Sequence, residues 1–122
     1  YGYVVASLGE LGGIVPYTSY SARISYIEEN KELIENFTKA IQKGIDYVHN
    51  HSDEEVAKAI INQFPDTSIE DIAKVVKRYR NIDAWPKTTE FSEDSFNHLQ
   101  DIMIDYGAID EKVPYAKLMY RG

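Results

Sequence analysis

Four consecutive residues near the start of the chain, Tyr17, Thr18, Ser19 and Tyr20, carry side chains suited to holding a small ligand. Their hydroxyl groups donate and accept hydrogen bonds, and tyrosine adds a flat aromatic surface. In an extended segment, Tyr17 and Ser19 would face one side while Thr18 and Tyr20 face the other. The same residue types are also common in strands that bind nothing. The spacing alone leaves both interpretations open, ligand contact or ordinary sheet packing.

Three glycines, Gly9, Gly12 and Gly13, come just before these residues. They allow a bend, because glycine accepts a positive φ without a Cβ clash. Pro16 cannot donate a hydrogen bond to a sheet, which favours the start or the edge of a strand for this residue. The glycine spacing matches neither of two known phosphate-binding motifs, G-x-x-x-x-G-K-[ST] and G-x-G-x-x-G. The three glycines therefore predict a bend ahead of residues 17–20.

The histidines offer a second kind of chemistry. His49 and His51 form an H-x-H sequence, with Asp53 and Glu54 close behind, and such side chains can bind a divalent metal. The run falls between two expected helices, where polar residues are common, and a metal site needs three or four converging ligands. His98 stands alone and is expected to be solvated. We predict no metal site and no cofactor.

The acidic side chains are numerous, but their spacing brings no pair together as acid–base catalysis requires. Most of them fall in the first turns of expected helices, where the helix dipole favours negative charge. No serine lies in a nucleophile-elbow sequence. The chain has no cysteine, which excludes thiolate chemistry within these residues. These observations favour a protein that is not an enzyme.

Composition limits the partners. The 122 residues carry a formal net charge of -7, which argues against binding the phosphate backbone of nucleic acid. The hydrophobic content of 43% and the charged content of 27% are typical of one folded domain. No apolar run approaches the roughly 20 residues that a membrane span needs. The sequence begins at Tyr1, with no methionine and no signal-like segment, and we expect it to be a piece of a longer protein.

The elements that would position these residues fall into two groups. Tyr1–Leu8 and Ile14–Ile24 are rich in β-branched and aromatic residues and predict two extended strands. The rest of the chain predicts about four or five helices from apolar residues at helical spacing. The fold class is therefore α+β, mostly helical. We expect the chain to form one compact, mostly helical unit with an extended N-terminal segment.

Local patterns set the limits of the helices. Asn30 is a suitable N-cap for the first long helix, and two capping boxes, Ser52 with Glu55 and Thr67 with Glu70, open the next two. The apolar faces predicted for these three helices are Leu33, Ile34, Phe37, Ile41, Ile45 and Val48; Val56, Ala59, Ile60 and Phe64; and Ile69, Ile72, Ala73, Val76 and Tyr79.

The last part of the chain carries similar patterns. Phe91 and Phe96 flank Ser92 as in a hydrophobic staple around an N-cap. Gly107 is placed to end that helix, and residues 113–120 predict a final turn. The apolar face predicted for the helix is Phe96, Leu99, Met103 and Tyr106.

Taken in order, several stretches form a familiar succession, above all VPYTSY, YIEENKELIENFTKAI, the WP pair at 85–86 and KVPYAKL at 112–118. They resemble the C-terminal part of solute-binding proteins of ABC importers in the alkanesulfonate, taurine, nitrate and thiamine-pyrimidine-precursor group. Nearly the whole chain takes part in this resemblance. Relatives often have proline where this chain has Lys31, and a small residue where it has Tyr106.

The resemblance implies a partial periplasmic-binding-protein-like (type 2) fold, in which two lobes close on a ligand about a hinge. Residues 1–13 would then be the end of the second lobe and the approach to the hinge. Residues 14–122 would be the crossover strand and the C-terminal helices of the first lobe. The resemblance would place a set of six residues at the mouth of the cleft between the lobes, and these are the candidate ligand-binding residues: Gly12, Gly13, Tyr17, Thr18, Ser19 and Tyr20.

The implied function is capture of a small ligand outside the cytoplasm, such as a sulfonate, a nitrate or a pyrimidine, and its delivery to an ABC permease. By this resemblance, the parallel sheet of the first lobe and most of the second lobe would lie outside these residues, so exposed apolar helix faces are expected to allow self-association. The alternative is an enzyme on the same scaffold, similar to thiamine-pyrimidine synthases that consume a histidine. In that case His49 or His98 would have to face the cleft.

Overall fold

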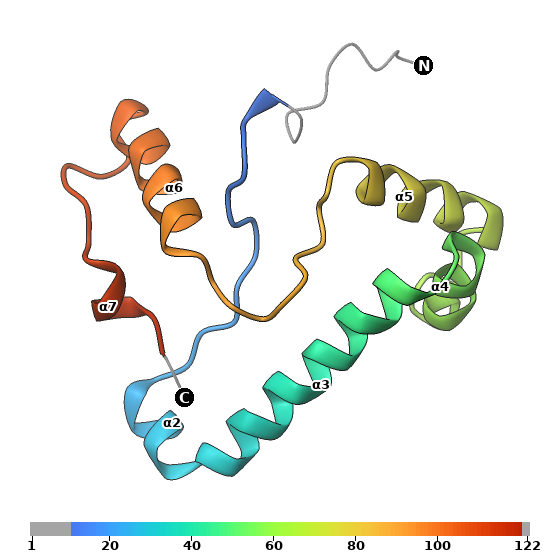
Figure 1. The fold of residues 1–122 in the computed structure, drawn as a ribbon, viewed down its shortest axis with the longest axis horizontal. Helices are drawn as coiled ribbons and strands as arrows, with labels where there is room; N and C mark the ends of the chain where they lie inside the picture. Colours follow the sequence, from blue (N-terminus) through green and yellow to red (C-terminus); the bar gives the residue numbers. More distant parts are fainter. Residues whose placement is uncertain (1–10, 121–122) are drawn as a thin grey trace. The chain divides into compact units, whose positions relative to one another are not determined.

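The computed structural model describes residues 11–120 (Figure 1). The helices in that range are α2 (Ile24–Glu29), α3 (Lys31–Asn50), α4 (Asp53–Ile60), the 3-10 turn η1 (Ile61–Gln63), α5 (Ile69–Asn81), α6 (Glu93–Asp105) and α7 (Tyr115–Leu118). The chain divides into two compact units. The second unit is Asn36–Thr89, and the first unit comprises the residues before and after that segment.

The prediction of a mostly helical chain is confirmed for the described residues. The predicted strand Tyr1–Leu8 lies outside them. The predicted strand Ile14–Ile24 differs from the structure, in which residues 14–23 have no regular secondary structure and α2 begins at Ile24. A strand needs a neighbour to complete its hydrogen bonds, and residues 11–120 contain no strand that could pair with this segment. The division at residues 1–13 and 14–122 stays a prediction, as does the two-lobe fold.

The core of the second unit lies between α4 and α5, which pack against each other (Figure 1). Its buried members are Val56 and Ala57 from α4 and Ile72 and Val76 from α5. Around them pack partly buried hydrophobic residues, namely Val48, Ile60, Ile61, Ala73 and Trp85. One side of α4, which carries Val56 and Ala57, is therefore buried, while Glu54, Glu55, Lys58 and Ala59 are exposed.

Two residues of the face predicted for α4 are placed wrongly, Ala59 and Phe64. Ala57 is fully buried where Ala59 was predicted to point inward, because α5 covers the side of α4 that carries Val56 and Ala57. Phe64 is 47% exposed, because the helix ends at Ile60 and the 3-10 turn changes the spacing of the residues that follow. Of the residues predicted for this face, Val56 is buried and Ile60 is partly buried.

The first capping box is confirmed. The Ser52 hydroxyl accepts a hydrogen bond from the Glu55 backbone N–H at 3.3 Å, and the Ser52 backbone N–H donates to the Glu55 carboxylate at 2.8 Å. The second box is wrong by one residue. Ser68, not Thr67, caps α5, and its hydroxyl accepts from the Asp71 N–H at 3.1 Å. The N–H of Thr67 donates instead to the Phe64 carbonyl, which holds Thr67 in the preceding turn.

The first unit is organised around the start of α6. Ser92 caps the helix by accepting from the Ser95 N–H at 3.3 Å. Phe91 and Phe96 meet edge-on, with ring centroids 6.0 Å apart, which confirms the predicted staple. The buried ring of Tyr115 on α7 meets Phe96 edge-on at 5.9 Å, and its hydroxyl donates to the Phe91 carbonyl. These contacts attach α7 to the beginning of α6.

The other end of α6 also follows the prediction. Gly107 has a φ of 74°, a conformation that favours glycine. Its N–H donates to the Ile104 carbonyl, and the N–H of Ala108 donates to the Met103 carbonyl, both at 2.8 Å. Tyr106, predicted to lie on the apolar face, is 88% exposed, because it is the C-cap residue just past the helix end.

Gln100 is a buried polar residue that sequence reasoning missed. Its side-chain amide accepts from the Val113 N–H at 2.7 Å and donates to the Val113 carbonyl at 3.3 Å. The amide thus bonds one residue of the loop as a neighbouring strand would. This pair of hydrogen bonds holds the segment before α7 against α6.

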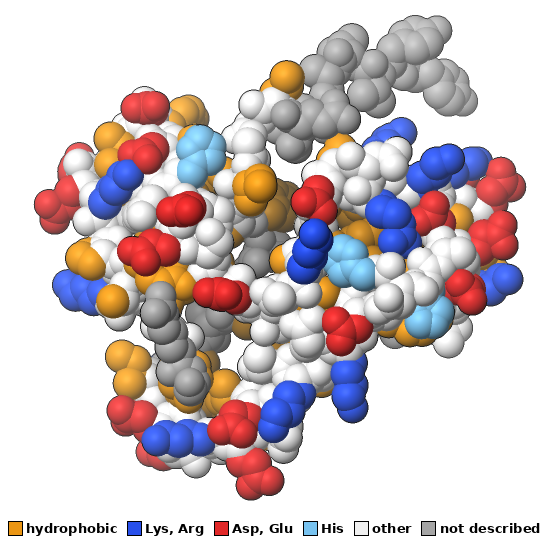
Figure 2. Space-filling view, in the orientation of Figure 1, with side chains coloured by type: hydrophobic (Ala, Val, Ile, Leu, Met, Phe, Trp, Pro, Cys, Tyr) orange, Lys and Arg blue, Asp and Glu red, His pale blue; other side chains and the backbone are white. Residues whose placement is uncertain are grey.

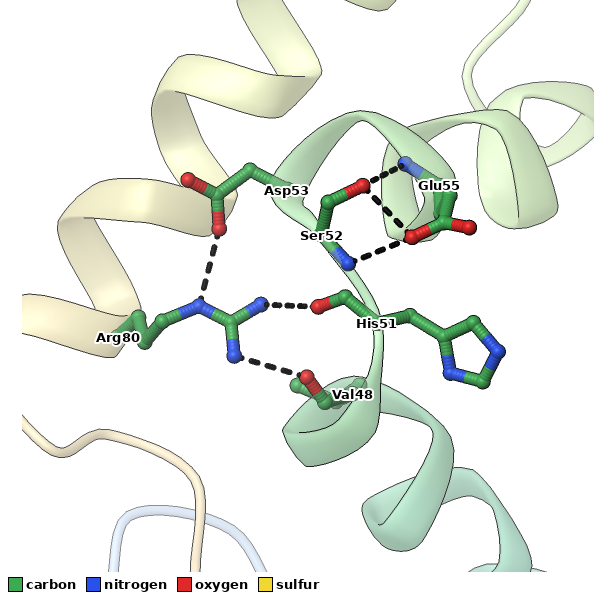
Figure 3. A network of polar contacts seen from close by, with 6 residues as sticks. All are labelled: Val48, His51, Ser52, Asp53, Glu55 and Arg80. Atoms are coloured by element: carbon green, nitrogen blue, oxygen red, sulfur yellow. Dashed lines mark hydrogen bonds and ion pairs between the residues drawn. The ribbon is translucent and has the colours of Figure 1, made fainter.

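The guanidinium of Arg80 joins the three helices of the second unit (Figure 3). It donates to the Asp53 carboxylate at 2.9 Å, to the Val48 carbonyl at 2.9 Å and to the His51 carbonyl at 3.1 Å. The Val48 carbonyl is among the last four of α3, which have no partner within the helix. Arg80 on α5 therefore completes the end of α3 and pairs with the first residue of α4.

Replacing Arg80 tests whether its hydrogen bonds to the end of α3 and the start of α4 stabilise the fold. Arg80→Met is expected to lower the free energy of unfolding by about 1–3 kcal/mol, because two carbonyls and a carboxylate lose their donor. Arg78→Met, on the exposed surface of the same helix, should change it by less than about 0.5 kcal/mol. Urea unfolding followed by circular dichroism measures both. Equal losses in the two variants would contradict the role assigned to Arg80.

The capping box makes stability depend on pH. Hydrogen bonds from the backbone N–H and the hydroxyl of Ser52 lower the pKa of Glu55 from its ordinary value of 4.5. A lowered pKa in the folded state means that the charged carboxylate stabilises the fold. This stabilisation is present above the unfolded-state pKa and is lost as the pH falls through the folded-state pKa.

Glu55→Gln should therefore flatten the loss of stability that the chain shows as the pH is lowered from about 5 to about 3. The glutamine side chain still accepts from Ser52 but does not titrate. Glu54→Gln removes the same charge from the same helical turn and serves as the control. Urea midpoints measured across this pH range compare the variants. A slope for Glu55→Gln that equals that of the unmodified chain would refute the assignment.

Candidate functional site

The candidate ligand segment is attached to α6 through Gly12. The Nε2 atom of His98 lies 3.0 Å from the Gly12 carbonyl oxygen. Because a carbonyl oxygen only accepts, this nitrogen carries the hydrogen and donates it. The expectation that His98 is simply solvated is thus corrected. Its side chain is exposed, but it holds the bend that precedes the candidate residues.

Gly13 needs to be glycine for two reasons. Its φ is 72°, which strains any residue with a side chain. A Cβ atom placed there would also lie 3.2 Å from the His98 Nε2 atom. The bend at Gly12 and Gly13 is therefore shaped both by backbone conformation and by contact with α6.

The other four candidate residues lie in the irregular segment before α2, with their side chains exposed. Tyr17 is 98% exposed and Tyr20 is 76% exposed. The structure thus brings Gly12 and Gly13 to α6 but does not gather Tyr17, Thr18, Ser19 and Tyr20 into a cavity within residues 11–120. The assignment of all six residues as ligand contacts stays a prediction.

An apolar groove of about 380 Å³ lies between α3 and α4 in the second unit. We call it the α3–α4 groove. One side is formed by α3, through Ile41, Gly44, Ile45 and Val48. The other side includes Val56, Ala59, Ile60 and Trp85. Sequence reasoning predicted the face of α3 but not the part played by Trp85, whose partners lie far away along the chain.

Polar side chains of α3 hold the segment that carries Trp85. The Gln42 amide donates to the Lys87 carbonyl and accepts from the Thr89 N–H, both at 3.1 Å. His49 donates from Nε2 to the Pro86 carbonyl at 3.0 Å. The backbone of residues 86–89 is therefore fastened along α3. The WP pair followed by polar residues was the sequence signal that such a segment existed.

A second pocket, of about 510 Å³, lies in the first unit. It is lined by Glu93, Tyr115, Ala116 and Met119. Neither this pocket nor the α3–α4 groove includes any of the six candidate ligand residues. Both pockets are therefore formed by other parts of the chain than the tyrosine-bearing segment.

His49 and His51 are each hydrogen-bonded to a backbone carbonyl. His49 bonds Pro86, and His51 Nδ1 bonds the Tyr47 carbonyl at 2.9 Å. The His51 ring also stacks on Tyr47, with centroids 3.7 Å apart, and it points away from Arg80 (Figure 3). Within the described part of the chain, no three His, Asp or Glu side chains lie close enough to hold a metal ion. The contacts of these histidines are those of structural residues.

The visible surface mixes charges of both signs. Figure 2 shows Lys and Arg side chains interspersed with Asp and Glu on the face that is drawn. Among residues 11–120, none of the helices combines the length and the apolar character that crossing a membrane requires.

Comparison with known proteins gives one informative similarity. Over 118 residues the chain is 36% identical to a protein named "Putative binding protein YtlA" from Bacillus subtilis (strain 168). The matched region is 97% of this chain but only 35% of that protein. No family model matches the chain. No solved structure matches it either.

The chain thus corresponds to about a third of a longer protein whose name describes it as a binding protein. The similarity extends through nearly every described element, including the segment with the candidate residues. It is compatible with a binding role and with the absence of catalysis.

The bend at Gly13 can be tested by substitution. Gly13→Ala should break the contact between His98 and Gly12, because it adds both backbone strain and a Cβ close to the imidazole. Gly13→Asn tests the Cβ contact with less backbone strain, since asparagine tolerates a positive φ better than alanine does. The ¹⁵N chemical shifts of the His98 ring report which nitrogen carries the hydrogen. Unchanged shifts in Gly13→Ala would contradict the contact.

Proposed function

We propose that the chain is part of a solute-binding protein that captures a small ligand outside the cytoplasm and delivers it to an ABC permease. The observation that carries this proposal is the 36% identity to YtlA over 97% of the chain. The ordered sequence stretches that resemble the C-terminal part of such proteins support it independently. The ligand class is a small polar or aromatic compound, such as a sulfonate, a nitrate or a pyrimidine.

The geometry of the first unit supports this role. The contact between His98 and Gly12 fixes the start of the candidate segment, and the side chains of Tyr17 and Tyr20 beyond it are largely exposed. Exposed aromatic side chains can close on a ligand together with a second lobe. Contact with a permease and self-association of the isolated chain stay predictions within this proposal.

The alternative of a histidine-consuming enzyme has less support. Such an enzyme needs a histidine free to approach the ligand. His49 and His98 each donate their Nε2 hydrogen to a backbone carbonyl, at Pro86 and Gly12 respectively. Their contacts therefore support structural roles. Mass spectrometry of the protein after incubation with iron and pyridoxal phosphate distinguishes the two functions, because only the enzyme would return an altered histidine.

Ligand binding is tested on the longer protein that carries these residues. A bound ligand stabilises the folded state by roughly RT ln(1 + [L]/Kd), about 2.7 kcal/mol at 100 times the Kd. Thermal unfolding is measured against a panel of sulfonates, nitrate and pyrimidines. A rise in Tm with one class supports the proposal, and no rise with any of them counts heavily against it.

Substitution of Tyr17 then tests the site. Because its side chain is 98% exposed, Tyr17→Ala should change the stability without ligand by less than about 0.5 kcal/mol. It should, however, remove most of the rise in Tm that the ligand produces. Tyr106→Ala is the matched control, a tyrosine that is 88% exposed at the end of α6. If both variants keep the full ligand response, Tyr17 is not a ligand contact.

A further inference from the structure

We infer that His98 is a positioning residue for the candidate ligand segment, and that its hydrogen bond to Gly12 helps to set the affinity for the ligand. The inference rests on the proposed function, in which residues 17–20 contact a ligand. It gives His98 no contact with the ligand itself. The imidazole acts through the backbone bend at Gly12 and Gly13.

His98 projects from a firmly held part of α6. Two residues before it and two residues after it, Phe96 and Gln100 are buried. Phe96 meets the ring of Tyr115 edge-on, and the Gln100 amide bonds both backbone groups of Val113. A donor on a packed helix is placed more precisely than a donor on a loop. The Gly12 carbonyl, 86 positions away in the chain, is therefore held at a defined place on α6.

The segment that follows this contact has no regular structure of its own. Residues 14–23 form neither helix nor strand, and the side chains of Tyr17 and Tyr20 are largely exposed. Binding a ligand to such a segment costs the conformational entropy of ordering it. The hydrogen bond at Gly12 lowers this cost, because it fixes the backbone at one end of the segment before a ligand arrives.

Gly13 shows that the bend and the imidazole fit each other. Its φ of 72° favours glycine, and a Cβ atom there would lie 3.2 Å from the Nε2 atom of His98. A side chain at this position would crowd the ring. Glycine instead lets Nε2 come within 3.0 Å of the Gly12 carbonyl oxygen, an ordinary hydrogen-bond length. Backbone conformation and hydrogen bond thus support the same bend.

Three variants of the longer protein separate the hydrogen bond from the rest of the side chain. His98→Leu removes the donor, whereas His98→Gln keeps a side-chain N–H that can reach the same carbonyl. Asp101→Asn is the control on the same helix, because it weakens an exposed ion pair with Lys112 that does not involve Gly12. Since His98 and Asp101 are exposed, all three variants should keep a Tm close to that of the unmodified protein.

The first measurement needs no ligand. Selective ¹⁵N labelling of glycine allows the backbone order parameters of Gly12 and Gly13 to be measured by NMR relaxation. We expect values of about 0.85, typical of rigid backbone, in the unmodified protein, in His98→Gln and in Asp101→Asn. In His98→Leu they should fall toward about 0.6, the range of flexible backbone. Unchanged order parameters in His98→Leu would overturn the inference.

The second measurement uses nitrate, taurine and cytosine as separate probes in calorimetric titrations. For each probe that binds the unmodified protein, His98→Leu should raise the Kd about threefold to tenfold, the effect expected for loss of one hydrogen bond that preorganises the site. His98→Gln and Asp101→Asn should keep the Kd within about twofold. A Kd that His98→Leu leaves unchanged would overturn the inference even if the glycines become mobile, because the contact would then be structural alone.

Failure of this inference can be told apart from failure of the proposed function. If none of the three probes binds the unmodified protein, the proposed function loses support, and the glycine order parameters decide whether His98 positions the segment. Glycines that become flexible in His98→Leu and rigid again in His98→Gln support the positioning role. Glycines that are equally rigid in both variants overturn it.

Discussion

The three hydrogen bonds of the Arg80 guanidinium are the constraint on which the second unit depends. The buried core there consists of four side chains from α4 and α5, and α3 contributes none. Hydrophobic burial alone therefore does not fix the end of α3. Arg80 does so by completing its carbonyls while pairing with Asp53 at the start of α4. Removing the donor would leave these acceptors without a partner, which costs more than the bonds themselves contribute.

Polar contacts fix α3 while its apolar side remains open. Gln42 and His49 bond the backbone of residues 86–89, and this segment brings Trp85 to the groove. The same arrangement recurs in the first unit, where the Gln100 amide bonds Val113 and the His98 ring bonds Gly12. In both units, side-chain to backbone hydrogen bonds place the irregular segments. These segments can thus be ordered without large buried areas of their own.

The features that the sequence predicts well are those that depend on residues a few positions apart. The Ser52–Glu55 box, the Phe91–Phe96 staple and the Gly107 helix end are all of this kind. The Thr67 box failed because two capping patterns overlap in one run of residues, and only the preceding turn decides between them. Local patterns therefore gave the starts of α4, α5 and α6 to within about one residue, but α4 ends at Ile60 instead of reaching Phe64.

Contacts between distant residues were beyond sequence reasoning. His98 and Gly12 are 86 positions apart, and Arg80 and Val48 are 32 apart. The segment 14–23 is irregular although its residues favour a strand, because strand formation depends on a neighbour that residues 11–120 do not include. The candidate site has the same limit. The chemistry of Tyr17 and Tyr20 can be read from the sequence, but their side chains are exposed in the described structure and line neither of the two pockets.

The position of Trp85 gives the chain an intrinsic optical reporter. It is the single tryptophan among the 122 residues, it lines the α3–α4 groove, and it meets Tyr79 edge-on at 5.7 Å. Indole emission shifts to shorter wavelength when water is removed from around the ring. The emission wavelength of Trp85 therefore reports how much water contacts its side of the α3–α4 groove, without a dye or a substitution.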